Sequence, residues 1–374
     1  MFTEEHNLIA DMVAQLCIDE VKPRTEARDK AKEYPKDELD ALFAHGLMAM
    51  TVPEEFGGSA ADYKSQGLAI ENIASANGGL STIVCVQAMV CSVLMSCANA
   101  AQKEKYLTKL TSEWVGAFAL TEAGAGSDAS AIATTAVKQG DHYILNGTKQ
   151  FITSGRNGQL AIVFAVTDKS AGKKGLSAFI VETDTKGYSA PTIEDKMGQH
   201  CSDTAQLVFE DMKVPAENLL GNEGDGYKIA LSNLENGRLS IAAQSLGLAR
   251  AAYMEALDYA RERKTFGKEI IQHQAVGFKL AEMKTKLKAA GHMVYDAAHL
   301  KDNGKPCLEA ACMAKLYASE VAEQIANDAI QIHGGYGYLN DFPIQRIYRD
   351  VRVCSIYEGT SDIQKMIILK EILK

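Results

Sequence analysis

The sequence is organised around the stretch Ile356-Tyr357-Glu358-Gly359-Thr360-Ser361-Asp362-Ile363-Gln364. One carboxylate, Glu358, stands there between an aromatic residue and a glycine, and three residues that favour a helix start follow. A loop-to-helix junction holds a side chain rigidly, and partial burial raises the pKa of a carboxylate towards neutrality, which suits a general base. The alternative, which this stretch alone leaves open, is a solvated glutamate in a turn.

Composition narrows the function classes. A chain of 374 residues is longer than one typical core, which predicts two or three packed units. The net charge of −9, with scattered Lys and Arg, argues against nucleic acid or an anionic membrane as the partner. The eight cysteines form no C-x-x-C pair, and no signal peptide is visible at the N-terminus. We therefore expect a reducing, cytoplasmic location and, because metal-ligand spacing is missing from the sequence, no metal site.

The hydrophobic period changes twice along the chain, which predicts an α+β multidomain protein. Residues 1–113 read as an N-terminal all-α domain, in which Pro23 is expected to close the first helix. Residues 114–222 contain short β-branched runs separated by turns and read as a middle β domain. Residues 223–374 read as a C-terminal helical bundle. The expected helices cover about 63–76, 80–97, 102–110, 229–263, 275–300 and 308–332, and the expected strands include 116–120, 142–145, 160–166 and 205–209.

A glycine-rich loop follows the first expected strand. Residues 121–129 match the spacing G-x-G-x-x-A, so a dinucleotide-binding fold is one interpretation. That fold requires a helix next, whereas a β-branched run at 132–137 follows here. We favour a loop whose free N–H groups meet a ring edge or a phosphate, with an ordinary hairpin turn as the alternative.

Two further motifs end long helices. Residues 261–268 form a cationic terminus that complements the helix dipole, or offers Arg263 and Thr265 to a pyrophosphate. Residues 331–338 include consecutive glycines, which permit close approach of a flat ligand to the backbone. His333 within this motif is expected to be structural.

Taken together and in this order, these segments resemble the acyl-CoA dehydrogenase family over essentially the whole chain. The resemblance implies a helical N-terminal domain, a β-barrel-like middle domain and a C-terminal four-helix bundle. It also implies FAD as cofactor, an acyl-CoA substrate, an electron-transferring flavoprotein as partner and a homotetramer built as a dimer of dimers. The family's base matches Glu358, because Gly237 occupies the position at which other members carry it.

The resemblance assigns site residues one by one. Several depart from the family pattern: Ala123 replaces a common Pro, Phe151 a Trp, His333 an apolar residue, and Asp362 a longer side chain. Matching acyl-CoA contacts are Ser127, Glu235, Asn236, Arg238 and Gly359. Matching flavin contacts are Phe118, Leu120, Thr121, Gly126, Ser127, Phe151, Ile152, Thr153, Arg263, Thr265, Phe266, Gln274, Gln331, Gly335, Thr360 and Asp362, of which Arg263 to Gly335 are expected to reach the cofactor of a neighbouring subunit.

The expected activity is dehydrogenation of an uncharged, short- to medium-chain acyl-CoA to the trans-2-enoyl-CoA. The absence of charge between Asn72 and Gln102, where the resemblance places the pocket floor, disfavours a dicarboxylic acyl chain. Met89 and Met95 are expected to shorten the pocket. Two alternatives stay open: the same chemistry reversed, as an enoyl-CoA or acryloyl-CoA reductase, and a non-catalytic CoA-binding protein on the same fold.

Overall fold

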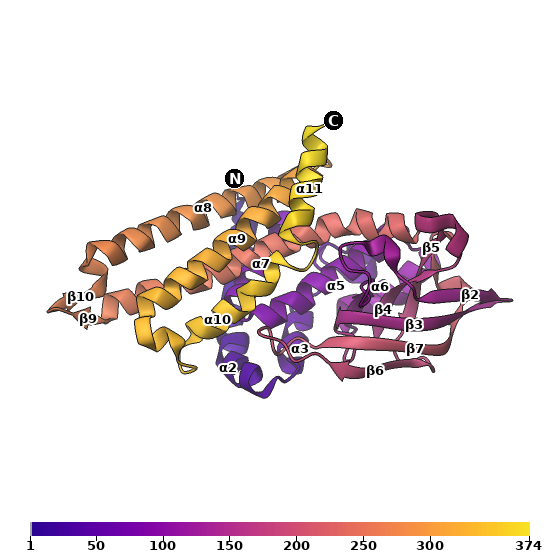
Figure 1. Cartoon of the computed structure of the whole chain (residues 1–374), viewed down its shortest axis with the longest axis horizontal. Coiled ribbons are helices and arrows are strands. Elements are labelled where there is room, and N and C mark those ends of the chain that lie inside the picture. The colour runs from indigo at the N-terminus through magenta and orange to yellow at the C-terminus, as the bar shows by residue number, and fades with distance from the viewer. Residues whose placement is uncertain (1) are drawn as a thin grey trace.

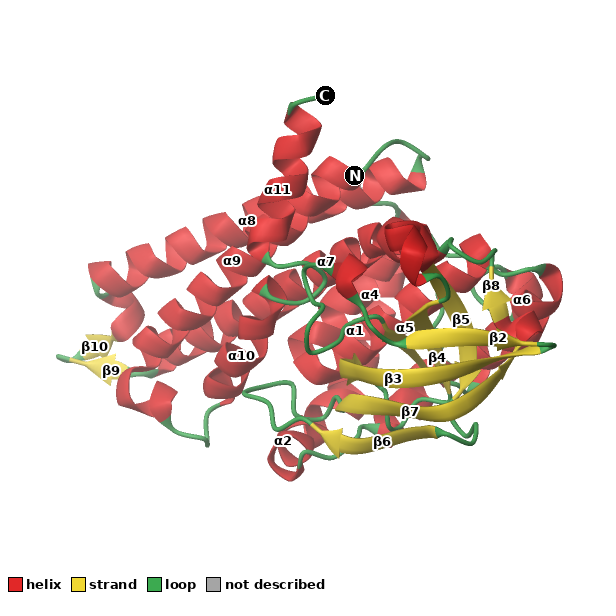
Figure 2. Cartoon of the chain, turned by 45° about the vertical axis from the view of Figure 1, so that its right-hand side comes forward, coloured by secondary structure: helices red, strands yellow, loops and turns green. Residues whose placement is uncertain are grey.

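The structure is a computed structural model that describes residues 2–374. Helices form both ends of the chain and a sheet forms its middle, so the predicted order of α, then β, then α is confirmed (Figure 2). The sheet lies at one end of an elongated molecule, and long helices extend from it towards the other end (Figure 1).

The N-terminal helices pack on the long C-terminal helices rather than forming an isolated body. One apolar cluster joins Val13, Ile73 and Leu80 to Leu246 and Ile325. The helix α4 begins at Tyr63 because Asp62 caps it, its side chain accepting a hydrogen bond from the Ser65 N–H. The helices of this region are α1 Glu4–Leu16, α2 Lys22–Ala31, α3 Lys36–Ala44, α4 Tyr63–Ala76, α5 Gly78–Cys97 and α6 Ala100–Ser112.

The expectation that Pro23 closes the first helix is wrong. Helix α1 continues through a π-helical segment, Cys17–Val21, directly into α2. Pro23 lies in the first turn of α2, directly after the π-helical segment, where the irregular backbone hydrogen bonding accommodates a residue without an N–H.

The middle of the chain forms an eight-stranded sheet in the order β6-β7-β3-β2-β4-β5-β8, with β1 pairing parallel to β4. Its inner face buries Tyr143, Phe179 and Phe209. No helix follows the glycine-rich loop beyond the short turn Ala129–Ala131, which excludes the dinucleotide-fold interpretation. The strands are β1 Gly116–Ala119, β2 Thr135–Gln139, β3 His142–Thr153, β4 Leu160–Val166, β5 Leu176–Glu182, β6 Tyr188–Ile193, β7 Thr204–Pro215 and β8 Leu219–Leu220.

The C-terminal helices are built on α7 Gly226–Glu262, which at 37 residues is about 55 Å long. A small hairpin, β9 Lys264–Thr265 and β10 Lys268–Glu269, turns the chain at the end of the molecule opposite the sheet (Figure 1). Helices α8 Gln274–Asp302, α9 Leu308–His333 and α10 Pro343–Val351 follow, and α11 Ser361–Ile372 projects from the body.

One helix, α5, is long and apolar enough to cross a membrane by length and composition. Its residues are mostly buried inside the protein, against β1, α4 and α7. The helix is therefore a core element of this fold.

Candidate active site

Glu358 lies in the short connection between the 3₁₀ turn Arg352–Ser355 and α11. Its φ of 52° and the φ of 87° at Gly359 are left-handed, and Thr360 then caps α11, its hydroxyl accepting from the Ile363 N–H at 3.3 Å. A left-handed glutamate is uncommon and costs about 1–3 kcal/mol, so the surroundings must impose this conformation.

Two buried side chains impose the left-handed conformation of Glu358 by donating hydrogen bonds to the carbonyls of the turn. The Lys315 ammonium on α9 donates to the Gly359 carbonyl at 2.7 Å, and the Gln364 amide on α11 donates to the Glu358 and Gly359 carbonyls at 3.1 and 2.8 Å. Lys315 and Gln364 are both fully buried. The backbone that carries Glu358 is thus held from two helices at once.

The carboxylate of Glu358 projects into a gap left by a glycine. Its Oε2 is buried and has no hydrogen-bond partner. A Cβ on Gly237 of α7 would lie 3.1 Å from the Glu358 carboxylate carbon and 3.4 Å from the Met89 sulfur. Gly237 therefore supplies the space that Glu358 fills, and Met89 lies against the same gap.

Burial raises the pKa of Glu358, and the positive charges of Arg238 and Lys315 partly oppose that rise. Burial also lowers the pKa of Lys315 to about 8. One oxygen of this carboxylate is buried without a partner and cations face the group, which suits it to accept a proton and excludes the solvated-turn alternative for this residue.

Two other candidate carboxylates, Glu122 and Glu235, are engaged in salt bridges. Glu122 pairs with buried Lys149 at 2.8 Å and also accepts hydrogen bonds from two backbone N–H groups, and the pKa of Glu122 is lowered by Lys149 against the effect of burial. Glu235 pairs with Lys301 at 2.8 Å and its pKa is also lowered. Neither is free to act as the base.

Three of the residues expected to contact acyl-CoA, Glu235, Asn236 and Arg238, lie on α7 next to Gly237. Asn236 donates to Ser92 on α5 at 2.6 Å, while its Oδ1 is buried without a partner. Arg238 is buried and its Nε has no partner. Unsatisfied buried polar atoms are rare in folded proteins, so two on one helix turn indicate a polar ligand.

The first group of expected flavin contacts lies at the end of β1, in the loop that follows it, and at the end of β3. Phe151 has a φ of 60° and an exposed side chain at a register irregularity of β3, so the ring is turned out of the sheet. Ile152 is buried in the sheet's core and offers only its backbone. Phe118 packs on Phe164. The other residues of this first group are Leu120, which is buried, Thr121 and Thr153, which are half-buried, and Gly126 and Ser127, which are exposed.

A second group lies around the hairpin at the far end of α7, away from the sheet (Figure 1). The Arg263 guanidinium lies over the Tyr336 ring at 5.5 Å, and Phe266 is left-handed and almost fully exposed. Within one chain the two groups are not brought together. The other residues of this second group are Thr265, which contacts His273, and the exposed residues Gln274, Gln331 and Gly335. Two expected flavin contacts, Thr360 and Asp362, belong to neither group and lie close to Glu358 in the sequence.

His333 is structural in its contacts. It is buried, its Nδ1 hydrogen-bonds the Ala329 carbonyl at 2.8 Å, and its ring stacks on Tyr259. Burial lowers the pKa of His333, so the ring stays neutral at pH 7.

Sequence reasoning missed Lys315, Gln364 and Gln244, which hold the segment from Tyr357 to Gly359. A signal for Lys315 exists: it shares a helix face with Ala311, Ala318 and Ala322, all buried, so a lysine there must be buried too. The two glutamines carry no comparable signal, because amides at apolar helix positions are common.

The residues present fit a flavin. A Cβ at Gly124 or Gly126 would meet nothing within 4 Å, so the loop leaves open space, and exposed Phe151 faces outward nearby in the same unit. The β domain, the open loop and the buried Oε2 of Glu358 together fit a flavin-dependent oxidoreductase. The chain belongs to the acyl-CoA dehydrogenase family: its N-terminal, middle and C-terminal domain descriptions match residues 3–113, 117–212 and 224–373. Members of this family are FAD-dependent oxidoreductases.

Full-length relatives carry related names. The short-chain specific acyl-CoA dehydrogenase of Clostridium acetobutylicum is 40% identical over 100% of this chain and 99% of its own length. The acryloyl-CoA reductase (NADH) of Anaerotignum propionicum is 40% identical over 100% of this chain and 95% of its own length.

Two solved structures are similar to this chain in both sequence and fold. A chain in a structure described as the electron transferring flavoprotein of Acidaminococcus fermentans superposes with a TM-score of 0.99 at 44% identity, covering 100% of this chain and 99% of that one. Butyryl-CoA dehydrogenase from Megasphaera elsdenii superposes with a TM-score of 0.98 at 41% identity, with the same coverage.

Proposed function

We propose that this protein catalyses the α,β-dehydrogenation of an uncharged short- to medium-chain acyl-CoA and passes the electrons to an electron-transferring flavoprotein. The observation that carries the proposal is the buried, unpartnered Oε2 of Glu358 in the space left by Gly237. Similarity to a short-chain specific dehydrogenase and to butyryl-CoA dehydrogenase supports the acyl length.

Glu358 acts as the base that takes the α-proton of the thioester. The raised pKa of Glu358 brings it closer to the pKa of that weak carbon acid, and the positive charges of Arg238 and Lys315 oppose protonation of Glu358 in part. The Glu358 N–H donates no backbone hydrogen bond within residues 2–374, so it is available to a thioester oxygen, where it stabilises developing negative charge. FAD, when bound, accepts the β-hydrogen as hydride.

The substrate pocket is inferred to be apolar and short. Met89 lies beside the base, and α4 and α5 carry no charge between Asn72 and Gln102. Met95 is half-buried at the end of α5 and supports the same inference. A carboxylate at the end of the acyl chain would be buried unpaired, which is costly. We therefore infer a preference for chains of about four carbons.

The active form is inferred to be an oligomer, a dimer of dimers. The support is the separation of the two groups of expected flavin contacts to opposite ends of one chain (Figure 1). A second subunit that brings its Arg263 end to the first subunit's β domain completes the site. We also propose domains at 1–113, 114–222 and 223–374, and a reducing, cytoplasmic location, which eight free cysteines support.

The test is spectroscopic. The purified yellow protein should be bleached under anaerobic conditions by butyryl-CoA, faster than by glutaryl-CoA or palmitoyl-CoA. A colourless protein that still binds CoA esters would instead favour the non-catalytic alternative. Faster turnover on glutaryl-CoA or palmitoyl-CoA would contradict the pocket argument.

A second candidate function is enoyl-CoA reduction, favoured by the similarity to an acryloyl-CoA reductase. The same residues serve it by microscopic reversibility, with protonated Glu358 returning a proton to the α-carbon. Oxidation of the pre-reduced flavoprotein by crotonyl-CoA, compared with reduction of the oxidised form by butyryl-CoA, measures which direction is favoured.

A further inference from the structure

The loop between β6 and β7, residues 194–203, leaves the sheet and packs against the C-terminal helices. Gln199 within it is buried and has a left-handed φ of 52°. Gly198 passes so close to α10 that a Cβ there would lie 2.6 Å from the Arg349 carbonyl carbon. A buried, strained, non-glycine residue in a loop indicates a functional constraint.

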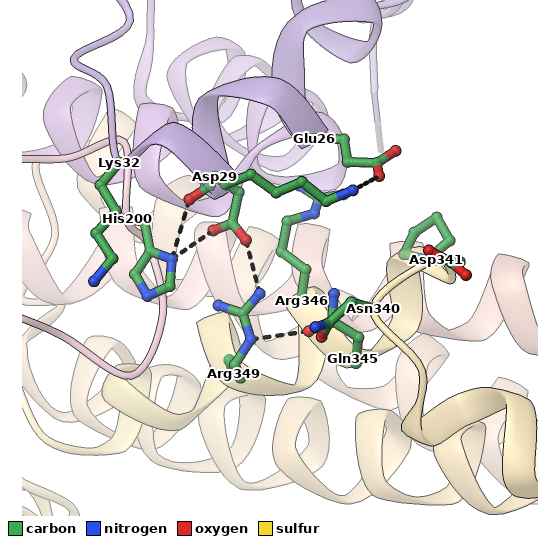
Figure 3. Close-up of a pocket in the computed structure, with 11 residues that line it drawn as sticks. Glu26, Asp29, Lys32, His200, Asn340, Asp341, Gln345, Arg346 and Arg349 are labelled. Carbon is green, nitrogen blue, oxygen red and sulfur yellow. Dashed lines mark hydrogen bonds and ion pairs between the residues drawn. The ribbon is translucent and has the colours of Figure 1, made fainter.

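The outer end of this loop is fixed by charge. A groove of about 280 Å³ lies between α2 and α10, and Asp29 at its centre pairs with Arg349 at 2.7 Å and with His200 of the loop at 3.2 Å (Figure 3). Arg349 also donates to the Met197 carbonyl at 3.1 Å. Side chains from all three units of the chain therefore anchor the loop here.

The inner end is fixed by Gln199. Its backbone N–H donates to a carboxylate oxygen of buried Asp350, and its side-chain amide donates to the Asp350 carbonyl at 3.1 Å. The same amide accepts from the Thr82 hydroxyl at 2.6 Å and donates to the Tyr357 hydroxyl at 3.4 Å. Gln199 thus connects the middle unit to the residue that precedes Glu358.

The Tyr357 hydroxyl completes the network by donating to the Gln244 carbonyl oxygen. The Gln244 amide in turn donates to the Thr82 hydroxyl at 2.7 Å and to Ser81 at 2.9 Å. Thr82 and Gln244 are buried, and burial raises the pKa of Tyr357, so its hydroxyl stays a neutral donor. Each of these hydroxyl and amide groups has a partner, and such buried networks specify a single geometry.

We propose that Gln199 is a positioning residue for proton abstraction: it fixes the Tyr357 hydroxyl and, through the next residue along the chain, the left-handed backbone that carries Glu358. The inference rests on the proposed function and adds a residue of the middle unit to the machinery that orients the base. Lys315 and Gln364 hold the far side of the same turn, so Gln199 supplies the support on the N-terminal side.

The experiment is a double-mutant cycle of Gln199→Leu and Tyr357→Phe, read as the anaerobic rate of flavin reduction per bound flavin at saturating butyryl-CoA. Gln199→Leu should lower this rate ~10- to 100-fold, because displacing a catalytic group by about 1 Å has that effect, with little change in substrate affinity. Because both residues act through one contact, the double variant should reduce within about 3-fold of Tyr357→Phe alone.

If Gln199 is only structural, Gln199→Leu should lower the unfolding temperature or the flavin content without changing the rate per bound flavin. That result would overturn the proposal. Fully additive effects of the two substitutions on the rate would overturn it as well. The control is Gln139→Leu, which makes the same chemical change at an exposed position of β2. The Gln139 side chain makes no hydrogen bond within residues 2–374, so the flavin of this variant should be reduced at the parent rate.

If Gln199→Leu does not fold, Thr82→Val removes the hydroxyl that holds the Gln199 amide and must lower the rate in the same way for the proposal to stand. A parent protein that no acyl-CoA bleaches would refute the proposed function itself. A parent that is bleached while Gln199→Leu and Thr82→Val reduce equally fast would refute only the positioning role.

Discussion

Replacement of Gly237 by alanine tests whether the gap on α7 sets the position of the base. The added Cβ would lie 3.1 Å from the Glu358 carboxylate carbon, against ordinary carbon–carbon contacts of about 3.5–4.0 Å, and closer still to Oε2. The carboxylate must therefore retreat by roughly 1 Å, which lowers the rate of proton abstraction by about 100-fold. The alanine itself favours the helix by about 1 kcal/mol, so lost stability does not explain a lost rate.

The assay is anaerobic stopped-flow reduction of the flavin-replete variant by butyryl-CoA, with flavin content and thermal unfolding measured on the same sample. Gly291→Ala on α8 is the matched control, because its Cβ would meet nothing closer than a Leu246 methyl carbon at 3.7 Å. A Gly237→Ala rate within a few-fold of the parent would show that Glu358 does not work in this gap.

Four further outcomes are expected. Glu358→Gln should keep flavin and acyl-CoA binding but slow flavin reduction by at least ~100-fold in stopped flow, and a change of only a few-fold would remove Glu358 as the base. Lys315→Met removes a cation that lowers the pKa of Glu358, so the acidic limb of the kcat–pH profile should move to higher pH; an unmoved limb counts against this coupling. Arg263→Ala should lose FAD and weaken assembly, and a fully flavinylated monomer in light scattering would contradict the shared site. Burial raises the pKa of Asp350 to about 6, above its unfolded value. The contribution of protonated Asp350 to stability is therefore present below about pH 4 and is lost as the pH rises through 6. Asp350→Asn keeps an acceptor for the Gln199 N–H and should flatten this part of the Tm–pH profile.

Much of the fold is predictable because its elements are strongly periodic. Strand β4 runs from Leu160 to Val166 as expected, since all seven residues are apolar and the first six are buried. Helix α4 runs from Tyr63 to Ala76 as expected, since Asp62 provides a recognisable cap. Pro23 was misjudged because proline is compatible with the first turn of a new helix as well as with the end of an old one.

The candidate site is only partly predictable. Glu358 and Gly237 are more than 100 positions apart, and their convergence follows from the packing of α7 against α11's leading turn, which no local pattern encodes. The same holds for Gln199 and Tyr357, whose contact depends on a loop crossing between units. Local patterns identify groups with chemical potential, whereas long-range packing decides which of them meet.

The separation of Arg263 from the β domain has a genetic consequence. In a shared site of the proposed kind, each cofactor depends on one chain for Phe151 and Glu358 and on another for Arg263. A strain that produces both a Glu358→Gln chain and an Arg263→Ala chain would then assemble some sites with both intact halves from two defective parents. Such intragenic complementation would restore part of the activity in mixed assemblies. Conversely, when one allele is defective and the other normal, a defective chain would also weaken sites whose other half comes from a normal chain.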